Sequence, residues 1–369
     1  MIPVFEPNIG EEEVEAVAAA VRRGEISGSF GEELPSFERE FARFVGAKHG
    51  VAVTSGTAAL QLAVAAAEIG PGDEVLVAAS THVGTALAAY HCGATPVPID
   101  SELETGNVDL DLIEPAITPR TKAIIPVHLF GHPVDMDRLL EIARRHDLVV
   151  IEDCAESHGA TVRGRVTGSF GDMGCFSFYA NKVVTTGEGG MVVTSEDALA
   201  ERLRKLRDMA PGERRFVHAE AGYNFRMTGY QAAMGRVQLR KIDSIIARKR
   251  RVAHAYDRVL ANVPGINTPT EAEWAQSIYW MYVIVLDDEF PLKRDALMAS
   301  LREAGIDTRT HFCPMNMQPF LRREPGFREV ACPVAERLWE TGLYLPSSTT
   351  LTTEEIERVV DQVRAPAVA

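Results

Sequence analysis

Leu148-Val149-Val150-Ile151-Glu152-Asp153 is a run of four apolar residues that ends in two carboxylates. Such a run is typical of a strand in a parallel sheet, because a parallel strand is covered on both faces. One of the two carboxylates is expected at the carboxyl edge of the sheet, where open α/β sheets bind their ligands. Asp153 is therefore a candidate site residue, and a helix cap for the segment that begins at Cys154 is the alternative.

Short β-rich runs alternate with helical stretches on both sides of this strand. The β-rich runs are 50–54, 74–78, 95–99, 123–127, 148–151, 176–178 and 190–194. The helical stretches are 11–22, 34–44, 58–67, 85–91, 135–145, 198–207 and 229–239. This order predicts an α/β fold in which a mainly parallel, mixed sheet is covered by helices.

The pattern changes after Leu239. A basic helical segment at 248–260 precedes Pro264, Pro269 and a β-rich run at 278–286. We place a domain boundary near residue 245, so that residues 1–245 form the large domain and residues 246–369 a small α+β domain. The last helix of the small domain is expected at 353–363.

The composition excludes several classes of protein. With 46% hydrophobic residues the 369-residue chain can bury a large core, and a formal charge of −14 repels nucleic acid and anionic lipid. No apolar run approaches the length of a membrane span or has the form of a signal peptide. The five cysteines form no Cys-x-x-Cys pair, so we expect free thiols and a cytoplasmic protein. His128 and His132 are interrupted by Gly131 and Pro133, and we expect no metal there.

A second candidate is the segment Thr54-Ser55-Gly56-Thr57-Ala58, which follows a strand and opens a helix. Its small residues leave backbone N–H groups free at the positive end of the helix, where a phosphate or carboxylate can bind. A plain capped helix start is the alternative, since Ser and Thr are also preferred N-caps.

The third candidate is residues 174–194, GCFSFYANKVVTTGEGGMVVT, in which one lysine lies among aromatic and β-branched residues. Partial burial lowers the pKa of a lysine and frees the neutral amine that attacks a carbonyl. Lys182 therefore fits a Schiff-base nucleophile. The alternative is a surface lysine whose stem packs on Phe176 or Tyr179.

Together the three segments indicate one cofactor. Pyridoxal phosphate needs an anion cradle, a carboxylate that faces its ring nitrogen and a lysine for its aldehyde. Gly56 and Thr57, Asp153 and Lys182 supply these groups in regions that are expected to reach one edge of one sheet.

Four segments resemble, in order and spacing, the DegT/StrS-type nucleotide-sugar aminotransferases over essentially the whole chain. They are SGTAAL, EDCAESHGA, FSFYANKVVTTGEGG and GYNFRMTGYQAAMGRVQL. The resemblance implies a fold type I pyridoxal phosphate enzyme, a homodimer with shared active sites, that moves an amino group from L-glutamate to a keto sugar on a nucleotide. Within the family the GDP-perosamine synthases look most similar, on the residues Glu152, Asp153 and Glu156 and the run NKVVTTGEGG. This implies a substrate like GDP-4-keto-6-deoxymannose.

The resemblance also implies residue roles. Lys182 would hold the cofactor as a Schiff base, and Asp153 would stay ionised against the ring nitrogen. The phosphate would be bound by Gly56 and Thr57 through backbone amides, by the hydroxyl of Ser177, and by Asn224 from the other subunit, while Glu156 would lie near the cofactor hydroxyl. By themselves, Ser177 is a strand residue, Asn224 a turn former and Glu156 an exposed helix charge.

Two positions depart from the family pattern. His82 stands where relatives stack an aromatic ring over the cofactor, and histidine can also ionise. The GDP-perosamine synthases have a run that resembles Phe-His-Pro-Met-His, whereas this chain has Phe312-Cys313-Pro314-Met315-Asn316 at the same place. His311, Cys313 and Asn316 are candidate substrate contacts, and a loop without such a role is the alternative.

Other functions remain open. Lys182 disfavours the sugar dehydratases of this fold, which resemble the family but carry histidine at the lysine position. Alternatives are aminotransferases for dTDP- or UDP-linked keto sugars or for cyclitols, aminobenzoate-forming synthases, and a catalytically silent sugar-binding homologue. A nicotinamide enzyme or a P-loop nucleotidase is disfavoured, because no strand leads into Gly-x-Gly-x-x-Gly and no Gly-Lys-Ser/Thr motif is present.

Overall fold

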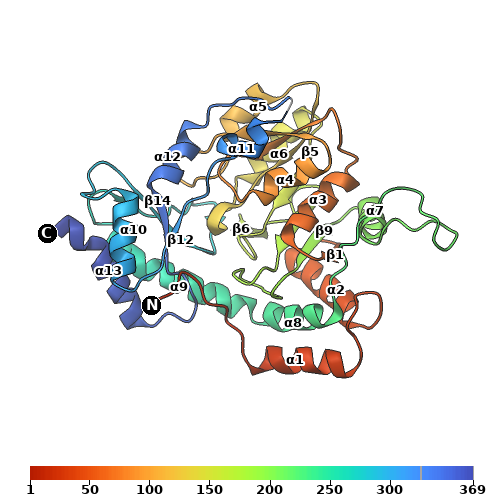
Figure 1. The fold of residues 1–369 in the computed structure, drawn as a ribbon, viewed down its shortest axis with the longest axis horizontal. Helices are drawn as coiled ribbons and strands as arrows, with labels where there is room; N and C mark the ends of the chain where they lie inside the picture. The colour runs from red at the N-terminus through yellow and green to blue at the C-terminus, as the bar shows by residue number, and fades with distance from the viewer. Residues whose placement is uncertain (325, 369) are drawn as a thin grey trace.

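The computed structural model describes residues 1–324 and 326–368, and its centre is a seven-stranded sheet (Figure 1). The strand order is β1-β9-β8-β5-β4-β2-β3. The strands are β1 (His49–Val53), β2 (Glu74–Ala78), β3 (Thr95–Ile99), β4 (Thr121–Ile125), β5 (Val149–Asp153), β8 (Met173–Ser177) and β9 (Gly190–Thr194). Strand β9 runs antiparallel to both of its neighbours, and the pairs from β8 to β3 are parallel. The predicted α/β fold with a mainly parallel, mixed sheet is confirmed.

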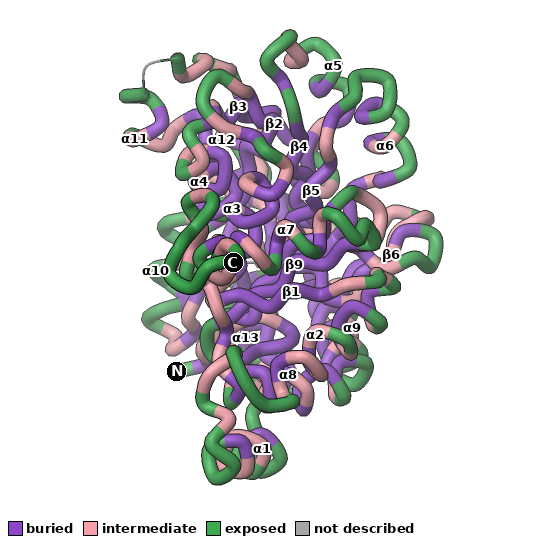
Figure 2. Tube along the Cα trace, turned by 90° about the vertical axis from the view of Figure 1, so that its right-hand side faces the viewer, coloured by how far each residue is buried: buried purple, intermediate pink, exposed green. Residues whose placement is uncertain are grey.

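Helices cover both faces of this sheet. The helices of this part of the chain are α1 (Glu11–Arg22), α2 (Glu33–Val45), α3 (Gly56–Ala66), α4 (Gly84–His91), α5 (Ile113–Ala116), α6 (Met136–Arg145), α7 (Asp197–Arg207), α8 (Gly229–Arg240) and α9 (Ile242–Leu260), with 3-10 turns η1 (Leu110–Leu112) and η2 (Leu129–Gly131). Of these, α1 packs on α8 and not on the sheet. Alternate residues of β9 enter different cores: Met191 and Val193 pack with α2 and α8, whereas Val192 packs with α3 and α7. Figure 2 shows the strands buried within the coat of helices.

The C-terminal part forms a second, antiparallel sheet in the order β10-β12-β14-β13. Its strands are β10 (Ile266–Asn267), β12 (Tyr282–Leu286), β13 (Arg309–Thr310) and β14 (Gly342–Leu345), and a third, small sheet joins β6 (Thr161–Val162), β7 (Arg165–Val166) and β11 (Ala275–Gln276). The remaining helices are α10 (Arg294–Glu303), α11 (Pro319–Arg322), α12 (Pro333–Thr341) and α13 (Thr353–Val368), with η3 (Met315–Met317). Helices α9, α10 and α13 pack on the second sheet in one apolar core.

The predicted boundary near residue 245 falls inside α9 and stays a prediction. The structure adds that the first residues of the chain belong with the small sheet. Ile2 lies in the same core as α9, α10 and α13, and its N–H and C=O bond to Gly305 and Asp307. Both ends of the chain therefore lie on the side of α13 in Figure 1.

Two predicted segments differ from the structure. The run 278–286 forms a strand only from Tyr282, because Tyr279 has a positive φ of 48°, which interrupts extended backbone. The basic helix begins at Ile242, six residues before the predicted start at residue 248. Within the described ranges, no helix combines the length and the apolar character that crossing a membrane requires.

Candidate active site

A cavity of about 620 Å³ lies where strands of the large sheet end, beside the second sheet. Nine of the predicted site residues line it: Gly56, Thr57, His82, Asp153, Glu156, Ser177, Lys182, His311 and Cys313. They come from segments more than 250 residues apart in the chain. The parallel order of β2, β4, β5 and β8 brings these segments to one edge, because parallel strands present their carboxyl ends together.

Lys182 lies in the connection between β8 and β9 and is nearly buried. Its Nζ is 3.7 Å from Oε1 of Glu156 and 3.7 Å from the centre of the Trp280 ring. Burial lowers the pKa of Lys182, and the negative charges of Glu156 and Asp153 oppose this shift. The lowered pKa increases the share of neutral amine that can attack a carbonyl.

Asp153 ends β5 and is 4% exposed. Its Oδ2 accepts a hydrogen bond of 2.8 Å from the hydroxyl of Thr85, and its Oδ1 accepts one of 3.1 Å from the N–H of Ala155. The bonds orient a carboxylate that lines the cavity. The alternative of a helix cap at Cys154 is wrong, because β6 is the next regular element after β5.

The N-terminus of α3 faces the same cavity. Ser55 caps the helix, since its hydroxyl accepts a 3.1 Å hydrogen bond from the N–H of Ala58. A Cβ on Gly56 would lie 2.6 Å from Cβ of Ser177, so glycine permits the close approach of the helix end to β8. Gly56, Thr57 and Ser177 thus form a wall with free polar groups at the positive end of a helix.

Glu156 is buried and is not the exposed helix charge that was its alternative. Its Oε2 accepts a 2.9 Å hydrogen bond from the N–H of Phe130, a residue with a positive φ of 52°. Burial raises the pKa of Glu156 to about 7, and the charge of Lys182 opposes this rise. The carboxyl group can therefore gain or lose a proton near neutral pH beside the candidate nucleophile.

His82 follows β2 and lines the cavity. Its Nδ1 accepts a 3.1 Å hydrogen bond from the N–H of Gly84, which leaves Nε2 to carry the proton of the neutral ring. Burial lowers the pKa of His82, and the charge of Lys182 lowers it further. His311 is also buried, and burial lowers its pKa to about 4. Both rings are neutral at pH 7.

Neither Asn224 nor Asn316 lines the cavity of one chain. Asn224 is exposed and its backbone pairs with Asp208. Asn316 is buried, and its Nδ2 donates a 2.8 Å hydrogen bond to Glu336. Their roles toward the cofactor and the substrate stay predictions, as do the roles of the nine residues that the cavity brings together.

Sequence reasoning missed Trp280 and Thr85. Trp280 lies in a segment that was assigned to a strand, yet its ring covers Lys182 Nζ and its Nε1 donates a 2.8 Å hydrogen bond to the carbonyl of Asn181. Thr85 was placed in a helix without a role, and it holds Asp153. No local signal marks either residue, because both contacts join segments that are distant in the chain.

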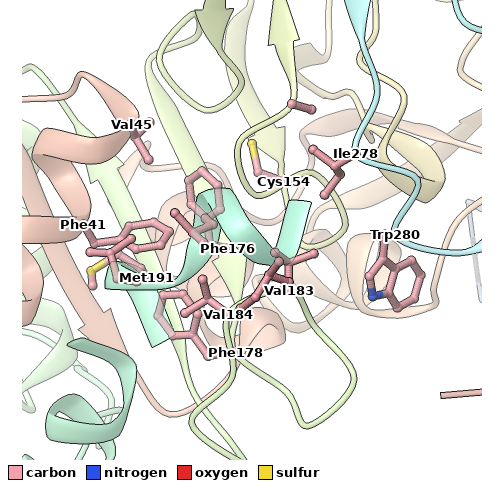
Figure 3. Packing of buried hydrophobic residues seen from close by; sticks show 14 of the residues in the cluster. Phe41, Val45, Cys154, Phe176, Phe178, Val183, Val184, Met191, Ile278 and Trp280 are labelled. Carbon is pink, nitrogen blue, oxygen red and sulfur yellow. The ribbon is translucent and has the colours of Figure 1, made fainter. Parts of the chain in front are cut away.

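The segment that carries Lys182 packs against an aromatic core. Val183 and Val184 are buried in the same cluster as Phe176, Phe178 and Trp280, as Figure 3 shows. Apolar packing of the two residues that follow Lys182 limits the movement of its backbone. The amine is therefore presented to the cavity from a rigid segment.

Within residues 1–324 and 326–368 one buried group, His128, Glu152 and Cys154, has the ligand spacing of a metal site. Within this group, the side chains of Glu152 and His128 already have hydrogen-bond partners in the protein. Glu152 accepts bonds from the N–H groups of three residues in the 168–171 turn, and His128 lies 3.1 Å from it through Nε2. His128 Nδ1 accepts a bond from the N–H of Val134. We interpret the group as a hydrogen-bonded link between β5 and its neighbouring turns.

The groups around the cavity suit pyridoxal phosphate. A buried lysine with a lowered pKa suits its aldehyde, the oriented carboxylate of Asp153 suits a protonated ring nitrogen, and the N-terminus of α3 beside the Ser177 hydroxyl suits its phosphate. No donor in this set conflicts with that cofactor.

Comparison with known proteins agrees with the site. The sequence pattern of the DegT/DnrJ/EryC1/StrS aminotransferase family matches residues 7–364. The chain is 43% identical to GDP-perosamine synthase of Caulobacter vibrioides, with 91% of each chain covered. It is 40% identical to dTDP-3-amino-3,4,6-trideoxy-alpha-D-glucose transaminase of Streptomyces venezuelae, with 98% of this chain and 95% of that protein covered.

A solved structure agrees as well. The PLP form of Spr1654 from Streptococcus pneumoniae superimposes with a TM-score of 0.93 at 29% identity, covering 100% of this chain and 98% of that one. The match in sequence and fold extends over both sheets, and the cavity holds the groups that the cofactor requires. The chain belongs to the DegT/DnrJ/EryC1/StrS aminotransferase family, and its cofactor is pyridoxal phosphate.

Proposed function

We propose that the protein transfers an amino group from L-glutamate to the keto group of a nucleotide-linked keto-deoxy sugar similar to GDP-4-keto-6-deoxymannose. The observation that carries the proposal is the buried Lys182, placed between Glu156 and Trp280 in the cavity that Asp153 and the N-terminus of α3 also line. A lysine at this position can take and return a proton, as transamination requires. The 43% identity to a GDP-perosamine synthase supports the sugar.

Asp153, Lys182 and Glu156 would each have a separate role in the transamination. Bound pyridoxal phosphate supplies a ring that withdraws the electrons left on carbon when a proton is removed. Asp153 would keep the ring nitrogen protonated, because its carboxylate is oriented by Thr85 and Ala155. Lys182 Nζ would take the α proton of the donor in the first half of the reaction and would deliver a proton to the former keto carbon of the sugar in the second half. Glu156, with a pKa of about 7, would hold or release a proton beside Lys182.

We further propose a homodimer in the cytoplasm with active sites shared between subunits. Asn224 is exposed on one chain and absent from that chain's cavity, which leaves it free to reach the phosphate of a partner. The Gly56 and Thr57 amides and the Ser177 hydroxyl would bind that phosphate from the first subunit. His82 would pack against the ring.

A second candidate substrate is a dTDP- or UDP-linked keto sugar, which the 40% identity to a dTDP-sugar transaminase favours. The cavity also differs from the GDP-perosamine synthase pattern, since Cys313 lines it in place of a histidine. His311 and Cys313, which line the cavity, would contact the sugar, whereas Asn316 donates a hydrogen bond to Glu336.

The test is a panel of GDP-, dTDP- and UDP-linked keto sugars, each incubated with the holoenzyme and L-glutamate, with amino sugar detected by mass. We expect product from the GDP-linked 4-keto-6-deoxy sugar at the highest kcat/KM. Higher kcat/KM with a dTDP or UDP sugar would replace the proposed substrate. A complete lack of product, together with no borohydride-stable link between cofactor and Lys182, would indicate a silent homologue. Lys182→Ala is the matched control for the link.

A further inference from the structure

Lys249 is a fully buried lysine on α9 that the proposed chemistry does not use. It is 1% exposed, and its Nζ donates hydrogen bonds of 2.7 Å to the carbonyls of Trp280 and Ser347. Burial lowers the pKa of Lys249 to about 7, and the charge of Lys182 lowers it further. Two backbone carbonyls are thus its hydrogen-bond partners, and its Nζ also lies 5.3 Å from the centre of the Phe5 ring.

Burying an amine is unfavourable compared with filling the same space by an apolar side chain. Removing an ammonium from water costs several kcal/mol unless hydrogen bonds compensate, whereas a methionine of similar shape has no such cost. The two carbonyls that Lys249 holds belong to adjacent segments at one end of the small sheet: Trp280 precedes β12, Ser347 follows β14, and the antiparallel register pairs Tyr282 with Leu345. The side chain therefore ties α9 to this one end of the sheet.

The bond to Trp280 leads directly to the candidate nucleophile. The Trp280 ring centre is 3.7 Å from Lys182 Nζ, and the indole N–H donates to the carbonyl of Asn181, the residue before Lys182. Trp280 is therefore held through its main chain by Lys249 and through its ring by the lysine segment, and the ring also lies parallel to that of Phe130, with 6.4 Å between the ring centres. Figure 3 shows the indole on the far side of Val183 from Phe41.

We propose that Lys249 is a positioning residue for the catalytic amine: by holding the Trp280 carbonyl, it keeps the indole face against Lys182 Nζ. The proposal rests on the assignment of Lys182 in the proposed function. A ring in this position restricts the amine to one side of the cavity and interacts with its charge. Position, rather than the charge of Lys249, is the property that matters.

The first measurement uses the cofactor-free protein. The chain has three tryptophans, so Trp274→Phe and Trp339→Phe leave Trp280 as the single tryptophan, which can be excited apart from the tyrosines at the red edge of the absorption band. In this background Lys249→Met should shift the Trp280 emission, and Lys182→Met should shift it as well because the ring loses its ammonium contact. The matched control is Tyr256→Phe, which removes another buried bond from α9, to the carbonyl of Pro346, and should leave the emission unchanged.

The second measurement uses the holoenzyme. Lys249→Met should lower kcat by about ten- to a hundredfold, the range expected when a reacting group moves by up to about 1 Å, with little change in KM. Trp280→Phe should lower kcat too, and the double variant should be about as slow as the slower single variant, since both act through one contact. Lys249→Gln keeps N–H donors without charge and should restore part of kcat. Tyr256→Phe should keep normal kcat.

Multiplicative losses in the double variant, or an unchanged Trp280 emission in Lys249→Met, would overturn the proposal and leave Lys249 a purely structural residue. If Lys249→Met does not fold, Lys249→Gln carries the same two measurements: a lowered kcat with a shifted Trp280 emission supports the proposal, and a lowered kcat with an unchanged emission overturns it. Because the emission of the cofactor-free protein needs no substrate, failure of the proposed reaction and failure of this proposal give different results.

Discussion

Glu156→Gln tests whether burial is the main cause of the raised pKa of Glu156. The carboxyl has a pKa of about 7 in the folded chain against 4.5 ordinarily, which corresponds to about 3 kcal/mol of destabilisation once it is ionised, at about 1.4 kcal/mol per pKa unit. Glutamine has the same shape, and its Oε1 can still accept from the N–H of Phe130. It does not titrate, so the substitution isolates the proton.

The direction in which the free energy of unfolding changes with pH follows from the number of protons that the folded and unfolded states bind. Unfolded chains release this proton near pH 4.5, whereas the folded protein keeps it up to about pH 7, so the folded state binds more protons between these values. The free energy of unfolding of the natural protein should fall through this window relative to that of Glu156→Gln. Between about pH 5 and about pH 8 the variant should gain about 2 kcal/mol on the natural protein.

The assay is urea unfolding of the cofactor-free protein at fixed protein concentration, which must be held constant if the chain dimerises. Lys182→Met is the informative second background. The Lys182 ammonium favours the ionised carboxylate of Glu156. Its loss in Lys182→Met should therefore raise the pKa of Glu156 and move the pH range over which stability changes to higher pH. A stability difference that stays constant with pH, or falls as pH rises, would refute the reasoning, as would a window that moves to lower pH in Lys182→Met.

Three further predictions concern catalysis and assembly. Lys182→Ala should abolish transamination with a nearly normal unfolding midpoint, because a methyl group cannot move a proton; near-normal turnover would remove Lys182 from the mechanism. Asp153→Asn should lower kcat far more than stability, since the amide still accepts from Thr85 but cannot keep a ring nitrogen protonated, and equal kcat in the two proteins would contradict this. Mixing Lys182→Ala with Asn224→Asp protein should restore part of the activity, because a mixed dimer places both lesions in one site; mixed dimers as inactive as both parents would exclude the shared site.

Local signals were sufficient for the seven strands of the large sheet and for most of the candidate residues. The apolar run of β5, the cap at Ser55 and the isolated lysine among aromatic residues are properties of neighbours in the chain, and strand order then brings their ends together. Periodicity and caps act over a few residues, so the sequence alone shows them.

The tertiary structure decided the partners of those residues. The antiparallel direction of β9, the burial of Glu156 and the contacts of Trp280 and Lys249 depend on segments that are up to 145 residues apart in the chain. Desolvation, which sets the pKa of Glu156 and Lys182, depends on everything that surrounds a group and not on its neighbours in sequence. For that reason the sequence by itself predicted the candidate groups, and only the packed chain determined how they lie relative to one another and how burial shifts their pKa values.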